Sequence, residues 1–74
     1  MKTAREKFEE LGYMFIKTSV SILYIKDSDY EYKSVEFYYS DFTFKADDDY
    51  HDPVRIDLAL FDAIQTQMRE LRWI

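Results

Sequence analysis

The chain has no cysteine, and its 74 residues include only one glycine, one proline and one histidine. Without cysteine there is no disulfide framework, no thiolate zinc site and no cysteine nucleophile. With so little Gly and Pro there is no flexible linker or low-complexity segment, so residues 1–74 are predicted to form a single domain. The longest stretch without a charge, Thr18 to Ile25, is far shorter than the ~20 residues of a membrane helix, so we expect no membrane association.

Positive charge is also scarce. The chain has fifteen acidic and ten basic residues, which gives a net charge of −5 and an isoelectric point near 4.7. This sign disfavours direct binding to nucleic acid, because the phosphate backbone attracts basic surfaces. No apolar segment follows the basic residues Lys2, Arg5 and Lys7, so we expect no signal peptide and a cytoplasmic location.

Hydrophobic residues, at 47%, and aromatic residues, at 19%, are plentiful and predict a compact core. A short helix is predicted at the start. Thr3 is its N-cap, Glu6 is the capping-box partner, Phe8 and Leu11 lie on one face, and Gly12 is the left-handed residue that stops it.

The next part of the chain is β-branched and aromatic, in runs separated by short polar breaks, which is typical of an antiparallel meander. The break at Thr18-Ser19 lacks Gly and Asn, so it is either a hairpin turn or a bulge in one long strand. The four expected strands are Tyr13–Lys17, Val20–Lys26, Tyr32–Tyr39 and Phe42–Ala46.

A final helix is predicted from Leu58 to about Arg72, with Asp57 as its N-cap, and Trp73-Ile74 is expected to dock against the fold. The predicted fold class is therefore α+β: a two-layer sandwich in the order α-β-β-β-β-α, with both helices on one sheet face. The aromatic residues expected to form the core are Phe8, Phe37, Phe42, Phe44, Phe61 and Trp73.

The seven tyrosines cannot all fit into one small core, so some must lie on the uncovered sheet face or its rim. Such a face favours contact with another protein or with a second copy of the chain, because Tyr supplies contact area at low entropic cost. Strand propensity alone is the simpler explanation. Stacking on single-stranded nucleic acid is disfavoured by the acidic residues around these positions. The candidates are Tyr13, Tyr24, Tyr30, Tyr32 and Tyr38.

An acidic loop follows the last strand, with a carboxylate at Asp47, Asp48, Asp49 and Asp52 and the only histidine, His51. Their spacing matches no calcium loop, so a solvated loop is favoured over a cation site. His51 has no nucleophile and orienting acid to complete a catalytic triad, so no enzyme activity, metal or cofactor is predicted. A second interpretation is that the four aspartates imitate the charge of DNA.

The two ends of the chain resemble a group of small uncharacterised proteins encoded by phages and prophages of Gram-positive bacteria. Residues 4–13, AREKFEELGY, resemble the ELGY helix with which those proteins begin. Residues 56–74, IDLALFDAIQTQMRELRWI, resemble their AI-x-x-Q-x-x-EL-x-W tail. Asp57 stands at the family's Thr and keeps an N-cap, Phe61 replaces Leu, and Arg72 replaces the Gly before Trp73. The matched tail positions are Ile56, Ala63, Ile64, Gln67, Glu70, Leu71 and Trp73.

This resemblance implies a helix-sheet-helix accessory protein and no particular activity. We therefore expect a non-enzymatic phage or prophage protein that binds a host or phage protein or associates with itself. The alternative is an acidic DNA-mimic inhibitor of a nucleic-acid-binding protein. A third class is a metal-dependent enzyme built on the segment Asp47–Asp52.

Overall fold

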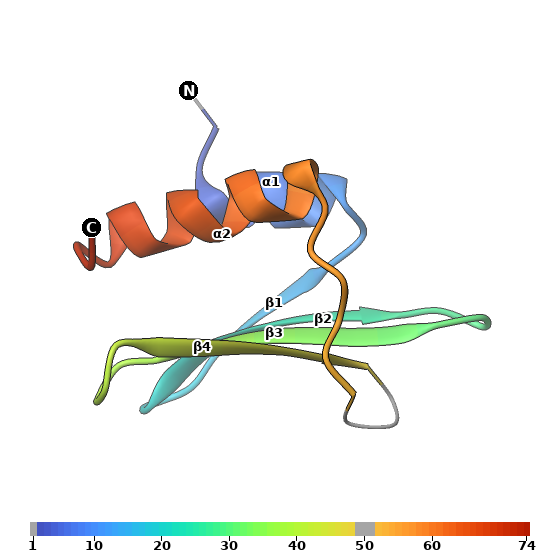
Figure 1. The fold of residues 1–74 in the computed structure, drawn as a ribbon, viewed down its shortest axis with the longest axis horizontal. Helices are drawn as coiled ribbons and strands as arrows, with labels where there is room; N and C mark the ends of the chain where they lie inside the picture. Colours follow the sequence, from blue (N-terminus) through green and yellow to red (C-terminus); the bar gives the residue numbers. More distant parts are fainter. Residues whose placement is uncertain (1, 49–51) are drawn as a thin grey trace.

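The computed structural model describes residues 2–48 and 52–74. One antiparallel sheet has the strand order β1-β2-β3-β4, and both helices lie on the same face of it (Figure 1). The predicted two-layer α+β sandwich is therefore confirmed. The elements are α1 (Ala4–Glu10), β1 (Met14–Lys17), β2 (Ser21–Asp27), β3 (Tyr32–Tyr38), β4 (Thr43–Asp48) and α2 (Leu58–Glu70).

Helix α1 begins and ends at the predicted residues. The hydroxyl oxygen of Thr3 accepts from the Glu6 N–H at 3.2 Å, and the Glu6 carboxylate accepts from the Thr3 N–H at 3.0 Å, which completes the capping box. Gly12 has a φ of +93°, and the following N–H of Tyr13 donates to the carbonyl of Phe8 at 3.0 Å. This is the Schellman stop that the glycine predicts.

Helix α2 ends with the same geometry although it has no glycine there. Arg72 takes a φ of +61°, and the Trp73 N–H donates to the carbonyl of Met68 at 2.8 Å. The Trp73 ring then lies 6.1 Å from the ring of Phe37 and 5.9 Å from that of Phe42, so the tail docks as expected.

The break at Thr18-Ser19 is a hairpin turn. The Thr18 N–H donates to the carbonyl of Ser21 at 2.9 Å, and the Thr18 hydroxyl oxygen accepts from the Ser21 N–H at 2.9 Å. Strand β4 starts after Phe42 because that residue has a φ of +58°, outside the strand region. It runs on to Asp48 because residues 52–54 pair with its outer edge: the Val54 N–H donates to the carbonyl of Ala46 at 3.0 Å.

The two helices are held to each other by polar contacts as well as by the core. The Lys7 ammonium lies 2.8 Å from the Asp62 carboxylate and donates to the Thr66 hydroxyl at 2.9 Å. The Ala4 N–H, one of the free donors of the first helical turn, donates to the Glu70 carboxylate at 2.7 Å. These contacts join α1 to α2 within the helix layer.

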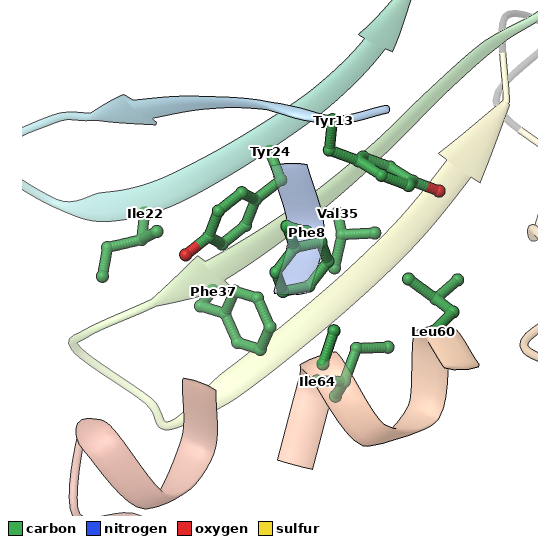
Figure 2. Close-up of a cluster of buried hydrophobic side chains, with 9 residues drawn as sticks. Phe8, Tyr13, Ile22, Tyr24, Val35, Phe37, Leu60 and Ile64 are labelled. Atoms are coloured by element: carbon green, nitrogen blue, oxygen red, sulfur yellow. The ribbon is translucent and has the colours of Figure 1, made fainter. Parts of the chain in front are cut away.

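The core lies between the layers and is centred on aromatic rings (Figure 2). The Tyr24 ring stacks on that of Phe8 with centroids 3.8 Å apart. Phe42, Phe44 and Phe61 were expected in this core, but they are 70%, 36% and 46% exposed. Phe42 lies in a turn, and Phe44 lies in the part of β4 that precedes its pairing with residues 52–54 and has a neighbouring strand on one side only. Phe61 lies beside the buried face of α2, which is formed by Leu60, Ala63, Ile64 and Gln67. The prediction was therefore wrong for these three residues.

Candidate functional site

The helices cover one face of the sheet and leave the other uncovered; we call it the open sheet face. Alternate residues of a strand point to opposite faces, and Val35 and Phe37 are buried against the helices, so their neighbours in β3 point the other way. Extending the register to the other strands gives the residues of the open sheet face: Met14, Ile16, Ser21, Leu23, Ile25, Asp27, Tyr32, Ser34, Glu36, Tyr38, Thr43, Lys45 and Asp47.

One half of the open sheet face is apolar. Met14 pairs with Ile25 and Ile16 pairs with Leu23 across β1 and β2. Met14 is 63% exposed and Ile16 is 38% exposed, although both are large apolar side chains. Both residues lie on β1, an edge strand of the sheet. Their side chains form an apolar surface that is exposed to solvent and that no part of the described chain covers.

The other half, on β3 and β4, is polar and internally bonded. The Glu36 carboxylate accepts from the Ser21 hydroxyl at 2.7 Å and from the Tyr38 hydroxyl at 2.8 Å. Partial burial, and then the neighbouring Glu36, raise the pKa of Tyr38, so its phenol stays neutral at physiological pH. The Lys45 ammonium lies 5.9 Å from the Tyr38 ring and 3.7 Å from the Asp47 carboxylate. A hollow on this half of the face is lined by Leu23, Tyr32, Ser34, Glu36, Lys45, Asp47 and Asp48.

The five candidate tyrosines fall into three places. Tyr32 and Tyr38 lie on the open sheet face, half-buried, as an exposed tyrosine surface requires. Tyr30 stands at the tip of the β2–β3 hairpin and is 97% exposed. Tyr13 and Tyr24 lie in the core and are only 6% and 1% exposed, so they cannot contribute to an exposed tyrosine surface.

The core tyrosines could have been recognised from strand register. In β2, Tyr24 alternates in phase with Ile22, and it pairs directly with the buried Val35. Tyr13 follows the Gly12 stop, and its ring meets Phe8 edge-to-face at 5.5 Å. The search for tyrosines did not identify the apolar half of the open sheet face, because Met14 and Ile16 are not aromatic. These two residues are placed beside Leu23 and Ile25 only by the pairing of β1 with β2.

The acidic residues do not form one cluster in the described part of the chain. Asp47 is ion-paired with Lys45 at 3.7 Å. The Asp48 carboxylate accepts from the Asp52 N–H at 2.9 Å, and the Asp48 N–H donates to the Asp52 carbonyl at 2.9 Å, so this pair closes the loop. Asp49 and His51 lie outside the described residues. Within residues 2–48 and 52–74, no three His, Asp or Glu side chains are placed to hold a metal ion.

The chain was compared with known proteins in three ways. No family model, no curated protein and no solved structure matches it. In the part of the chain that the structure describes, no helix is long and apolar enough to cross a membrane.

Proposed function

We propose that this protein is a non-enzymatic accessory protein of a phage or prophage, that it works in the cytoplasm of the bacterial host, and that it acts by binding protein. The binding surface is the open sheet face, and its first partner is a second copy of the chain. The phage origin is supported by the motifs at the two ends of the sequence. The binding role is supported by one observation above all: the open sheet face is half apolar, exposed and complementary to itself.

The complementarity follows from two neighbouring rows of side chains that run across the strands. The first row is Met14, Ile25, Ser34 and Asp47, and the second is Ile16, Leu23, Glu36 and Lys45. Consider a two-fold axis that is parallel to the sheet, perpendicular to the strands and midway between the two rows. It brings the open sheet faces of two copies together, with the first row of each copy opposite the second row of the other. Apolar residues then meet apolar residues over β1 and β2, as in other face-to-face sheet packings.

The polar half is matched by the same operation. Ser34 meets the Glu36 carboxylate of the second copy, and Asp47 meets the second copy's Lys45. Lys45 is 57% exposed, so its ammonium is free to turn from its own Asp47 to that of the neighbour. Opposite charges that face each other fix the register of an interface more than they add to its affinity.

The size of the open sheet face sets the expected strength. Four strands about 4.8 Å apart, with four, seven, seven and six residues at ~3.3 Å each, give roughly 400 Å² per copy. Twice this area is below the ~1,200 Å² of standard stable interfaces. We therefore expect a dimer that forms at high protein concentration and dissociates on dilution, and that gives way to a larger partner.

Imitation of DNA by the acidic loop has less support. The Asp47 carboxylate is ion-paired with Lys45, and the Asp48 carboxylate accepts from the Asp52 N–H. Neither arrangement presents a row of free carboxylates to a basic groove.

Sedimentation equilibrium over a wide concentration range tests the proposed dimer. Ile16→Asp is expected to abolish self-association, because it places an unpaired charge in the apolar half. Leu58→Asp is the matched control: Leu58 is 86% exposed but lies on α2, so the same change there leaves the dimer intact. A chain that is monomeric at millimolar concentration and recovers no protein in a pull-down contradicts the proposal.

A charge exchange tests the register. Lys45→Asp and Asp47→Lys each bring like charges together across the two-fold axis and weaken the dimer, whereas the double exchange restores opposite charges and recovers it. Equal dimerisation by all four proteins would show that the two copies meet in another way.

A further inference from the structure

A second place in the molecule has the chemistry of a binding site, and it is independent of the open sheet face. A pocket of about 80 Å³ lies where the end of α1, the strands β2 and β3, and the start of α2 meet. We call it the basic pocket. Besides two leucines, its lining consists of Tyr13, Lys26, Lys33, Arg55 and Asp57. We infer that the basic pocket binds a small oxyanion of the phosphate type.

The hydroxyl group of Tyr13 supports the binding of an oxyanion in the basic pocket. The side chain is 94% buried, since only 6% of it is exposed, and it lines the basic pocket. Its oxygen points away from the other labelled core side chains (Figure 2), and it makes no hydrogen bond with any residue in the described part of the chain. No fully buried side-chain oxygen among the described residues lacks a partner, so the tip of this otherwise buried side chain is open to the pocket. The hydroxyl is therefore available to an acceptor in the pocket.

Two lysines that share one carboxylate also support the binding of an oxyanion. Lys26 and Lys33 are direct partners in the β2–β3 register, an arrangement in which like charges repel. The Glu31 carboxylate lies 3.0 Å from the Lys26 ammonium and 3.3 Å from that of Lys33. The two ammonium groups are thus already placed to share one oxyanion, and they lower the pKa of Glu31 accordingly.

The net charge around the basic pocket is positive, unlike that of the whole chain. The chain carries five more acidic than basic residues, yet three of its ten cations line this one pocket. Glu31 and Asp57 offset two of them and leave one net positive charge. The positive end of the α2 dipole lies at the same place, since Asp57 is its N-cap and accepts from the Leu60 N–H at 2.8 Å.

The fold builds this pocket through the glycine that stops α1. A Cβ atom added to Gly12 would lie 3.3 Å from the Lys26 side chain, so the absence of a side chain lets the stem of Lys26 pass. The size of the pocket limits the ligand: sites for drug-sized molecules have ≈ 300–1,000 Å³, so a nucleoside does not fit, whereas a phosphate group does. Tyr13, the two lysines and Arg55 would donate to its oxygens.

The probe is inorganic phosphate, with O-phosphoserine as a second arm that distinguishes a free anion from a phosphate carried on a larger molecule. ¹⁵N–¹H spectra at pH 7.5 and constant ionic strength are expected to show saturable shifts at Gly12, Lys26, Lys33 and Leu58 with phosphate, and none with chloride. Tighter binding of O-phosphoserine indicates a monoester ligand, and tighter binding of inorganic phosphate indicates the free anion. Equal responses to phosphate and chloride overturn the inference.

Variants locate the site. Tyr13→Phe keeps the ring and removes only the unpartnered hydroxyl, so it weakens phosphate binding about tenfold while the protein stays folded. Arg55→Gln, at an exposed residue, also weakens binding, and Glu31→Gln strengthens it because the competing carboxylate is gone. Lys45→Gln, on the open sheet face, changes nothing. Unchanged affinity in both Tyr13→Phe and Arg55→Gln overturns the inference, and neither variant affects the proposed dimer.

Discussion

Tyr13 and Tyr24 are both buried core tyrosines, but their hydroxyl groups have different surroundings. The Tyr24 hydroxyl donates to the side-chain oxygen of Gln67 at 2.5 Å, and Gln67 itself is only 3% exposed. The Tyr13 hydroxyl has no partner among the described residues. The hydrogen bond between Tyr24 and Gln67 stabilises the core, because without it each of these two side chains would be a buried polar group with no partner.

The same substitution at these two tyrosines should therefore have different effects on stability. Tyr24→Phe leaves the buried Gln67 amide unpaired and is expected to lower the free energy of unfolding by about 1–3 kcal/mol. Tyr13→Phe removes a hydroxyl that forms no hydrogen bond with residues 2–48 or 52–74, and it is expected to change the free energy of unfolding by less than about 0.5 kcal/mol. Urea unfolding of both variants beside the parent protein measures the difference. Equal losses would mean that the Tyr13 hydroxyl has a structural role.

At the scale of the helix, the stop of α2 offers a prediction about backbone conformation. Arg72 occupies the left-handed position that Gly12 occupies after α1, and an L-residue with a side chain pays for that conformation by roughly 1 kcal/mol. Arg72→Gly should raise the free energy of unfolding by about 0.5–1 kcal/mol. Arg69→Gly, three residues earlier within α2, is the control and should lower it by about 1 kcal/mol. Urea midpoints decide, and a loss of stability in Arg72→Gly would contradict the argument.

The ends of the elements could be predicted because their signals are local. Thr3, Glu6 and Gly12 specify a helix through groups within a few residues of one another, and Asp57 does the same for α2. The left-handed conformation of Arg72 could not be predicted from its residue type, since arginine carries no such preference. It is imposed by the docking of Trp73 against Phe37 and Phe42.

The surfaces were harder to predict because they depend on which strands become neighbours. Alternation assigned Phe44 to the helix side of β4, but only the strand order shows that β4 is an edge and that Phe44 is partly exposed. The basic pocket joins Tyr13, Lys26 and Arg55, which lie on three different segments of the chain. No sequence pattern of fixed spacing relates residues that only the tertiary fold brings together.

At the scale of the whole molecule, the two proposed surfaces lie on different layers. The open sheet face is the side of the sheet away from the helices (Figure 1). The basic pocket is lined by residues on the helix side of the sheet and at the start of α2. A dimer formed through the open sheet face therefore leaves the pocket accessible in both copies. Phosphate binding and self-association should be energetically independent, which is why variants of one surface are valid controls for the other.

The stability of the whole fold should depend on pH in the alkaline range. Burial raises the pKa of Tyr24 and, in the same direction, that of Tyr13, because a phenolate in the core would lose its hydration. Unfolded tyrosines ionise near pH ~10. Above that pH the unfolded chain gives up protons that the folded chain keeps, so the free energy of unfolding falls as pH rises beyond about 10. These two groups cause no such fall at lower pH.

Tyr24→Phe removes one of the two groups and is expected to flatten that decline, although the variant is less stable at neutral pH. Tyr30→Phe is the matched control, since it makes the same change at a residue that is 97% exposed and outside the core. Urea titrations at a series of pH values between 8 and 12 give the slope, and tyrosinate absorbance follows the ionisation directly. A slope that is the same in the parent protein and in Tyr24→Phe would mean that Tyr24 binds its proton equally well in the folded and unfolded chains. The burial of Tyr24 would then not set the alkaline limit of the fold.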